Sequence, residues 1–167
     1  MPTPNELKTD FWSALKSDKT VMLGLAGVEH GHTRPMTARI EGDTGPIWFF
    51  GDRDTELVKS LDRSQSAVFS FSAKDHDLFA AVDGVLQVDM NRAVIDRLWN
   101  SAIAAWYKGG KDDPRLALLR FDPGQAEIWQ SESSLFAGVK ALLGVESQTN
   151  RDGKKAEVSL ATGRASP

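Results

Sequence analysis

Apolar residues recur with two different periods along the chain, and these periods predict where helices and strands lie. Near the start, every fourth residue is apolar and therefore falls on one helical face: Leu7, Phe11 and Leu15. Thr3 is a capping residue, Pro4 suits the first helical position, and Glu6 stands three residues after the cap, which together form a helix-start signature. We therefore expect a first helix that ends near Ser17.

Beyond residue 20 the pattern changes to alternation with a period of two, which is typical of strands. The expected strands cover 20–27, 32–41, 45–51, 66–71, 76–88, 115–121 and 125–130, with a short helix near 54–63. The last two strands are predicted to form a hairpin around Asp122-Pro123-Gly124, a good turn sequence. Gly84 lies inside a long strand and suggests a bulge. Long strands bent at a glycine suit a small closed barrel.

Two helices are expected in the second half of the chain. Asp89 is predicted to cap a helix from about Asn91 to Tyr107, whose apolar residues form two adjacent stripes, wider than one core contact requires. A second subunit would explain that width. Ser133 or Ser134 is expected to start a last helix that ends at Gly144.

The composition changes after this point and predicts one domain with a tail. From Val145 onward there are few large apolar residues, so the segment cannot bury enough surface to offset the entropy of ordering. We expect one domain over residues 1–145 and a flexible C-terminal tail over 146–167.

Composition and charge narrow the function classes. A chain of 167 residues with 41% apolar composition suits one compact domain. The net charge of -3 gives no reason to expect nucleic acid or an anionic membrane as partner. The chain has no cysteine, which excludes disulfides, thiolate catalysis and cysteine-ligated zinc. No apolar run is long enough to span a bilayer, and we expect a cytoplasmic protein.

Residues 32–59 hold the groups that could bind a phosphate. Arg34 is a cation at the rim of an apolar strand face, and Pro35 indicates a sheet edge or a strand start. Thr55 and Lys59 are four residues apart on one face of a helix start, where backbone N–H groups attract anions. Three carboxylates crowd the same helix start and would repel an anion unless they point away: Asp52, Asp54 and Glu56.

Other kinds of site have weaker support. There is no Ser/His/Asp spacing typical of a hydrolase, no Walker or dinucleotide fingerprint and no helical metal motif. His30 and His32 beside Glu29 suit a solvated turn better than a metal site, and His76 suits a strand rim better than a general base. A bound organic cofactor remains, for which the protein supplies position and electrostatics.

Several runs of residues together form a pattern that resembles a known family. They are Arg34-Pro35-Met36, Trp48-Phe49-Phe50, Thr55-x-x-x-Lys59, His76-Asp77-Leu78-Phe79, residues 93–100, residues 105–114 and Ala126-Glu127-Ile128-Trp129. The pattern resembles the pyridoxamine 5'-phosphate oxidase-like split barrels, and within them the general stress protein 26 group. It extends over roughly residues 7–144, and its most specific part is the run from Trp106 to Pro114.

The resemblance implies a mainly β fold with flanking helices, an FMN-binding split barrel, with FMN, or FAD, at a homodimer interface. Arg34 and Lys59 would pair with the phosphate, and Thr55 would donate from its hydroxyl. Trp99 and Trp106 are candidates for a ring wall from the partner subunit. The other residues that the resemblance assigns to the cofactor site are Pro35, Met36, Thr37, Trp48, Phe49, Phe50, Gly51 and Leu57.

The implied function is that of an FMN-binding general stress protein, a flavin-dependent oxidoreductase with an unidentified substrate. True pyridoxamine phosphate oxidases carry an Arg-x-His substrate motif near their end, and residues 131–136 lack it, which argues against vitamin B6 oxidation. Two alternatives remain open. One is a flavin carrier or stress sensor without turnover, and the other is a split barrel that holds haem or a deazaflavin, where a haem would need an imidazole ligand.

Overall fold

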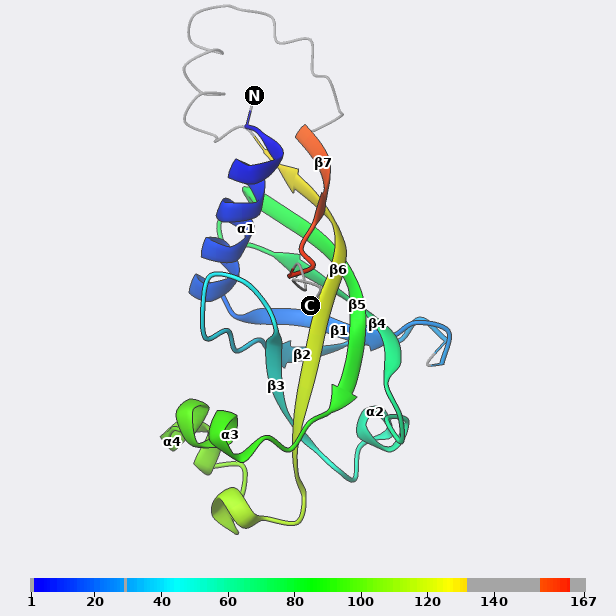
Figure 1. Cartoon of the computed structure of the whole chain (residues 1–167), viewed down its shortest axis with the longest axis vertical. Coiled ribbons are helices and arrows are strands. Elements are labelled where there is room, and N and C mark those ends of the chain that lie inside the picture. The colour runs from blue at the N-terminus through cyan, green and yellow to red at the C-terminus, as the bar shows by residue number, and fades with distance from the viewer. Residues whose placement is uncertain (1, 29, 132–153, 163–167) are drawn as a thin grey trace, which may run out of the picture.

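The fold is built on one antiparallel sheet (Figure 1). The structure, a computed structural model, describes residues 2–28, 30–131 and 154–162. The elements in chain order are α1 (Pro4–Ser17), β1 (Thr20–Leu25), β2 (Arg34–Thr37), β3 (Ile47–Asp52), α2 (Glu56–Lys59), β4 (Gln65–Ser72), β5 (Leu78–Val88), α3 (Arg92–Leu98), α4 (Ser101–Ala104), the 3-10 helix η1 (Gly110–Asp112), β6 (Leu116–Gln130) and β7 (Lys154–Ser159).

The strands pair in the order β2-β1-β4-β5-β6-β3, and β7 pairs with β6 beside this path. The two outer strands come together just beyond the end of β2, where Arg39 and Trp48 form an isolated antiparallel bridge. Their two backbone hydrogen bonds are both 2.8 Å long. The sheet therefore curls until its edges meet at one point, which confirms the expected mainly β architecture with flanking helices.

The core follows from the alternation seen in the sequence. In β4, Ala67, Phe69 and Phe71 are buried while Val68 is partly exposed. The first helix is also confirmed, since Thr3 and Glu6 form the expected capping box. The apolar face of α1 joins the main core of the sheet; its buried residues are Leu7, Phe11, Trp12 and Leu15.

Gly84 explains the largest departure from the predicted strands. The predicted hairpin at 122–124 is wrong, because β6 runs through Pro123 as one strand of 15 residues. β5 has a register shift between Val82 and Gly84, and Gly84 pairs with Pro123. Proline is tolerated at such an irregularity, so the residues that suggested a turn mark a bend shared by two long strands.

The region between β5 and β6 also differs from the prediction. The helix expected over 91–107 is divided into α3 and α4, and the break lies at Trp99 and Asn100. The side chain of Asn91, rather than Asp89, caps α3 by accepting from the backbone N–H of Val94 at 3.3 Å. Asn100 caps α4 in the same way at 2.9 Å. A second capping residue inside the apolar stripe thus starts a new helix.

The strands expected over 32–41 and 45–51 and the helix near 54–63 also need correction. β2 pairs with β1, and β3 pairs with β6, so the two strands share only the bridge near Arg39. Helix α2 covers only Glu56–Lys59, with Thr55 as its cap. The segment that joins β2 to β3 therefore crosses between the two ends of the sheet.

The C-terminal prediction is wrong for residues 154–160. β7 forms a ladder with Gln125–Gln130 of β6, and Val158 and Leu160 are buried in the main core. The two apolar residues are two positions apart and therefore lie on one face of the strand. Their burial stabilises the strand although most of the residues around them are polar. The helix expected between Ser133 and Gly144 lies outside the described residues.

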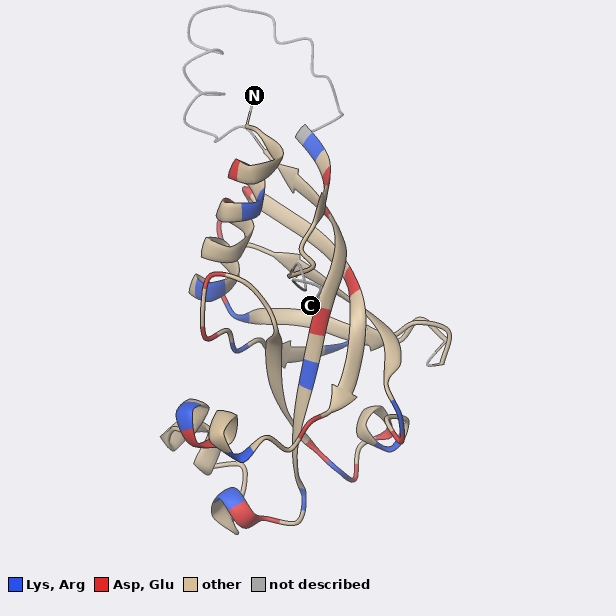
Figure 2. Cartoon of the chain, in the orientation of Figure 1, with Lys and Arg blue, Asp and Glu red and all other residues tan. Residues whose placement is uncertain are grey.

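Charged residues are unevenly distributed over the fold. In Figure 2 they lie on α1, α2, α3, η1 and the adjoining loops and at a few positions of β6 and β7, whereas β1 and β4 are largely free of them. α2, α3 and α4 lie toward the same end of the sheet (Figure 1). In the part of the chain that the structure describes, no helix is both long and apolar enough to cross a membrane.

Candidate functional site

A groove of about 770 Å³ lies at the end of the sheet where α2, α3 and α4 are found. Its walls come from β2, from the end of β3 with α2, and from α4 with the segment that follows it. The lining residues are Arg34, Pro35, Met36, Thr37, Arg39, Phe50, Gly51, Asp52, Thr55, Glu56, Leu57, Val58, Ala102, Ile103, Trp106, Tyr107 and Arg115.

β2 forms one wall because it is an edge strand. Its alternation is as predicted: Arg34 and Met36 are partly buried, and Pro35 and Thr37 are exposed. Arg34 Nη1 donates to the carbonyl oxygen of Leu23 at 3.2 Å. This bond holds the guanidinium at the groove and ties β2 to the neighbouring strand.

The start of α2 forms the second wall. The Thr55 hydroxyl donates to the carbonyl oxygen of Asp52 at 2.7 Å and accepts from the N–H of Val58 at 3.4 Å. Lys59 Nζ lies 3.6 Å from Glu56 Oε1, its side chain is 56% exposed, and it does not line the groove. Of the three groups predicted to form a phosphate cradle, Arg34 and Thr55 thus line one groove, and Lys59 lies outside it.

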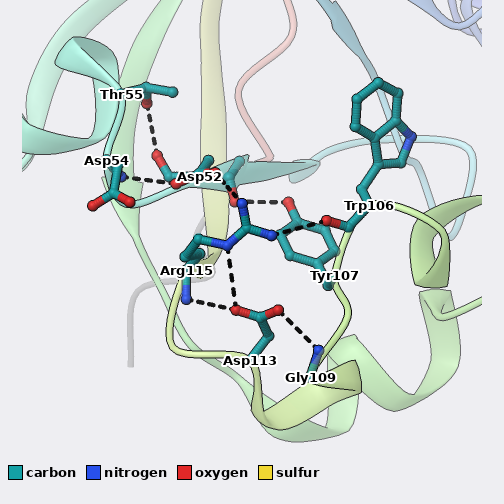
Figure 3. A network of polar contacts seen from close by, with 9 residues as sticks. Asp52, Asp54, Thr55, Trp106, Tyr107, Gly109, Asp113 and Arg115 are labelled. Atoms are coloured by element: carbon teal, nitrogen blue, oxygen red, sulfur yellow. Dashed lines mark hydrogen bonds and ion pairs between the residues drawn. The ribbon is translucent and has the colours of Figure 1, made fainter.

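The third wall is organised by Arg115 (Figure 3). Its Nη2 donates to the carbonyl oxygen of Trp106 at 3.2 Å, and its Nη1 lies 3.6 Å from Asp52 Oδ2. Asp113 accepts from the backbone N–H groups of Gly109 at 3.0 Å and Arg115 at 2.9 Å. These two backbone hydrogen bonds lower the pKa of Asp113, so it is a carboxylate that fixes the loop at neutral pH.

Tyr107 joins this loop to β3. Its hydroxyl donates to the carbonyl oxygen of Gly51 at 2.7 Å (Figure 3). Burial, together with the nearby carboxylate of Asp52, raises the pKa of Tyr107 to about 12. The phenol is therefore neutral at physiological pH and acts as a hydrogen-bond donor.

Replacing Tyr107 with phenylalanine is expected to lower the free energy of unfolding by about 1 kcal/mol, because the Gly51 carbonyl loses a partner. The folded-state pKa of about 12 lies above 10.0, the ordinary pKa of a tyrosine side chain. Stability from this group is therefore complete below pH 10 and falls as the pH rises toward 12, where the unfolded state ionises first. Urea denaturation at pH 8 and pH 11 should show a smaller alkaline loss in Tyr107→Phe than in the wild type. An equal loss in both proteins would contradict this role.

The predicted aromatic residues fall into two groups. Phe50 and Trp106 line the groove, and Trp106 is 77% exposed. Trp99 lies behind the groove wall, with its ring 6.1 Å from that of Phe50 and 6.2 Å from that of Tyr107. Trp48 and Phe49 are buried in the two hydrophobic clusters, so their side chains serve packing.

Two further predicted residues, Gly51 and Leu57, also line the groove. Sequence reasoning missed Asp52 as a partner of Arg115, and it missed Tyr107 and Arg115 themselves. For Tyr107 the signal lies in the run from Trp106 to Pro114, the most specific part of the pattern, in which only Trp106 has a predicted role. Only the fold brings this loop to the end of β3.

Comparison with known proteins finds a matching family model and similar solved structures. A family model described as "Pyridoxamine 5'-phosphate oxidase like" matches residues 6–152. A crystal structure of a general stress family protein from Xanthomonas campestris is 58% identical over 80% of this chain and 92% of that chain, with a TM-score of 0.75.

Two further solved structures are similar. The general stress FMN/FAD binding protein from Xanthomonas citri is 58% identical over 77% of this chain and 92% of that chain, with a TM-score of 0.73. A general stress protein 26 from Jannaschia sp. is 32% identical over 94% of this chain and 99% of that chain, with a TM-score of 0.80.

Proposed function

Because the chain belongs to the pyridoxamine 5'-phosphate oxidase-like family, we propose that it binds a flavin nucleotide, FMN or FAD, in the groove between β2, α2 and the loop after α4. The observation that carries the proposal is the chemistry of the groove walls. A flavin joins a flat, largely apolar ring system to an anionic phosphate. The groove offers apolar side chains beside guanidinium groups, so its residues fit that ligand.

The apolar part of the groove would take the ring system. Met36 and Phe50 come from the two strands, and Leu57 and Ile103 come from α2 and α4. Burial of such a ring against apolar side chains supplies most of the binding free energy at a cofactor site. Backbone groups of Met36 and Gly51 are available nearby to orient its polar edge.

Arg34 would bind the phosphate. A guanidinium presents several N–H groups in a plane that matches a phosphate, and Arg34 is partly buried at the β2 wall. Thr55 lines the same groove as a second polar group. Lys59 would have to leave Glu56 to reach the ligand, so we assign the principal contact to Arg34.

Asp52 and Glu56 also line the groove and could repel a phosphate bound at Arg34. Asp52 accepts the backbone N–H of Asp54 at 2.8 Å and faces Arg115, which offsets part of its charge. Glu56 is exposed and lies 3.6 Å from Lys59. Each acidic side chain therefore has a basic neighbour that offsets part of its charge.

We also propose that two copies of the chain form a homodimer. Support comes from the outward face of the sheet, which carries partly exposed apolar side chains on β1, β4 and β5: Met22, Val68, Phe79 and Val85. β2 also has an unpaired edge in the described sheet. Light scattering during gel filtration, with and without FMN, tests this assembly.

Flavin-dependent oxidoreduction is the proposed activity, with the bound flavin supplying the electron chemistry. The role of the chain in this proposal is to bind and orient the flavin and to limit access of water. The neutral Tyr107 is committed to Gly51 and so is not an evident proton donor. A flavin carrier without turnover is the second candidate, favoured by the commitment of the Tyr107 hydroxyl to Gly51.

The test is to purify the protein and record its absorption spectrum. We expect yellow protein with flavin bands, and after removal of the flavin we expect saturable binding of added FMN. Bleaching by a nicotinamide nucleotide would support the oxidoreductase, and a stable spectrum would support the carrier. A Soret band, or failure to bind either FMN or FAD, would overturn the flavin proposal.

A further inference from the structure

Arg115 holds more hydrogen-bonding capacity than its described neighbours use. A guanidinium has five N–H donors, and among the residues that the structure describes Arg115 makes one side-chain hydrogen bond, to the carbonyl oxygen of Trp106. Its ion-pair distances to Asp52 and Asp113 are long, at 3.6 Å and 3.7 Å. The side chain is 46% exposed and lines the groove.

The backbone that carries this guanidinium is nevertheless fixed. Asp113 is buried and accepts the backbone N–H of Arg115, so the loop cannot easily turn the residue away. Tyr107 anchors the other side of the same loop to Gly51. The backbone of Arg115 is therefore held in place beside the groove, and its side chain has donors left for an anion. Such an arrangement favours anion binding because little backbone entropy is lost.

Trp106 adds a planar surface beside that cation. Its carbonyl oxygen accepts from Arg115 at 3.2 Å, and its side chain is 77% exposed while still lining the groove. Figure 3 shows the indole extending away from the polar cluster. An exposed tryptophan beside an arginine is suited to a ligand that combines a flat ring with a negative charge.

We propose that Trp106 and Arg115 form a binding position for an adenine nucleotide, in which the adenine stacks on the indole and Arg115 binds a phosphate. The inference rests on the proposed function, because Arg34 is taken to bind the flavin's own phosphate and Arg115 then serves a second anion. Aromatic residues stack on nucleobases, and arginine suits phosphate. The adenylate belongs either to FAD itself or to a nicotinamide dinucleotide that reduces a bound FMN.

Two measurements test the proposed adenine-nucleotide position. One is calorimetric titration of FMN-loaded protein with AMP, and the other is the affinity of the flavin-free protein for FAD and for FMN. Arg115→Ala is expected to weaken the adenylate contact at least about tenfold, and Trp106→Ala about tenfold. Trp106→Phe should retain most of the affinity, because phenylalanine still stacks. Asp52→Asn should strengthen the contact, since it removes the competing carboxylate.

Controls separate this position from general charge and from folding. Lys108→Ala removes an exposed positive charge next to Tyr107 that does not line the groove, and it should leave AMP and FAD binding unchanged. Arg115→Lys keeps the positive charge but loses the planar N–H donors of the guanidinium, so this variant should bind the adenylate more weakly than the wild type. Because Trp106 is exposed, its substitution reports on binding even if an Arg115 variant is unstable.

The outcomes distinguish the two sources of the adenylate. If AMP binds to FMN-loaded protein and this binding requires Trp106 and Arg115, the adenylate belongs to a nicotinamide dinucleotide. A preference for FAD over FMN that disappears in the same variants, without AMP binding, supports FAD. If neither measurement responds to Trp106 and Arg115 while FMN still binds, this inference is overturned and the proposed function stands. Loss of FMN binding in the Arg115 variants would assign Arg115 to the flavin's own phosphate, and it also overturns this inference.

Discussion

Arg34→Ala is expected to weaken FMN binding about 100-fold while leaving the affinity for riboflavin unchanged. Riboflavin has the same ring and ribityl chain but no phosphate, so the difference isolates the contact that Arg34 is proposed to make. A charge-assisted hydrogen bond contributes about 1.5–3 kcal/mol, and a bidentate pair adds to this. Fluorescence titration of the flavin-free protein with both ligands measures the two affinities.

A matched control for this change is Arg63→Ala, which removes an exposed arginine that does not line the groove. Because Arg34 also donates to Leu23, a thermal melt of each variant is needed to confirm that β2 still pairs. If Arg34→Ala weakens riboflavin as much as FMN, the side chain shapes the groove instead of binding phosphate. Unchanged FMN affinity in a folded variant would place the phosphate elsewhere.

Gly84→Ala is expected to lower the free energy of unfolding by about 3 kcal/mol. A Cβ at this position would clash with the carbonyl oxygen of Asp122 and come within 2.6 Å of Phe121 Cζ. The oxygen belongs to the backbone of β6, so a rotamer change cannot relieve the overlap. The bend shared by β5 and β6 must open instead. Chemical denaturation followed by circular dichroism gives the magnitude.

Gly42→Ala is the matched control, because a Cβ there meets nothing within 4 Å and the position is exposed. We expect a change within about 0.5 kcal/mol for this surface site. Similar destabilisation in both variants would show that the loss of glycine flexibility, and not the close approach of two strands, determines the effect.

The sequence predicted those parts of the fold that depend on local pattern. Alternation in β4 and the capping box at Thr3 specify their elements without help from the rest of the chain. The continuous course of β6 through Pro123 was not predictable in this way, because Gly84 on a different strand makes the bend tolerable. The segment around Val158 and Leu160 was likewise not predictable from local pattern, because most of its residues are polar. It forms a strand because it pairs with β6 and because these two side chains pack in the main core.

The candidate site shows the same division. Arg34 and Thr55 were found because cations and hydroxyl groups near a strand edge and a helix start have a direct chemical interpretation. Arg115 was missed because its role arises only when β6 pairs with β3 and brings it near Asp52. Lys59 satisfied the spacing rule, but in the structure it is directed to Glu56 on its own helix.

The pairing of β7 with the second half of β6 also bears on how the protein tolerates truncation. β5 pairs with one side of Ala126–Gln130, and β7 pairs with the other side of Gln125–Gln130. A chain shortened before residue 154 would bare a row of backbone donors and acceptors, together with apolar surface that Val158 and Leu160 cover. Exposed strand edges of this kind recruit strands from other molecules, so proteolysis in this region would be expected to promote aggregation even with the flavin groove intact.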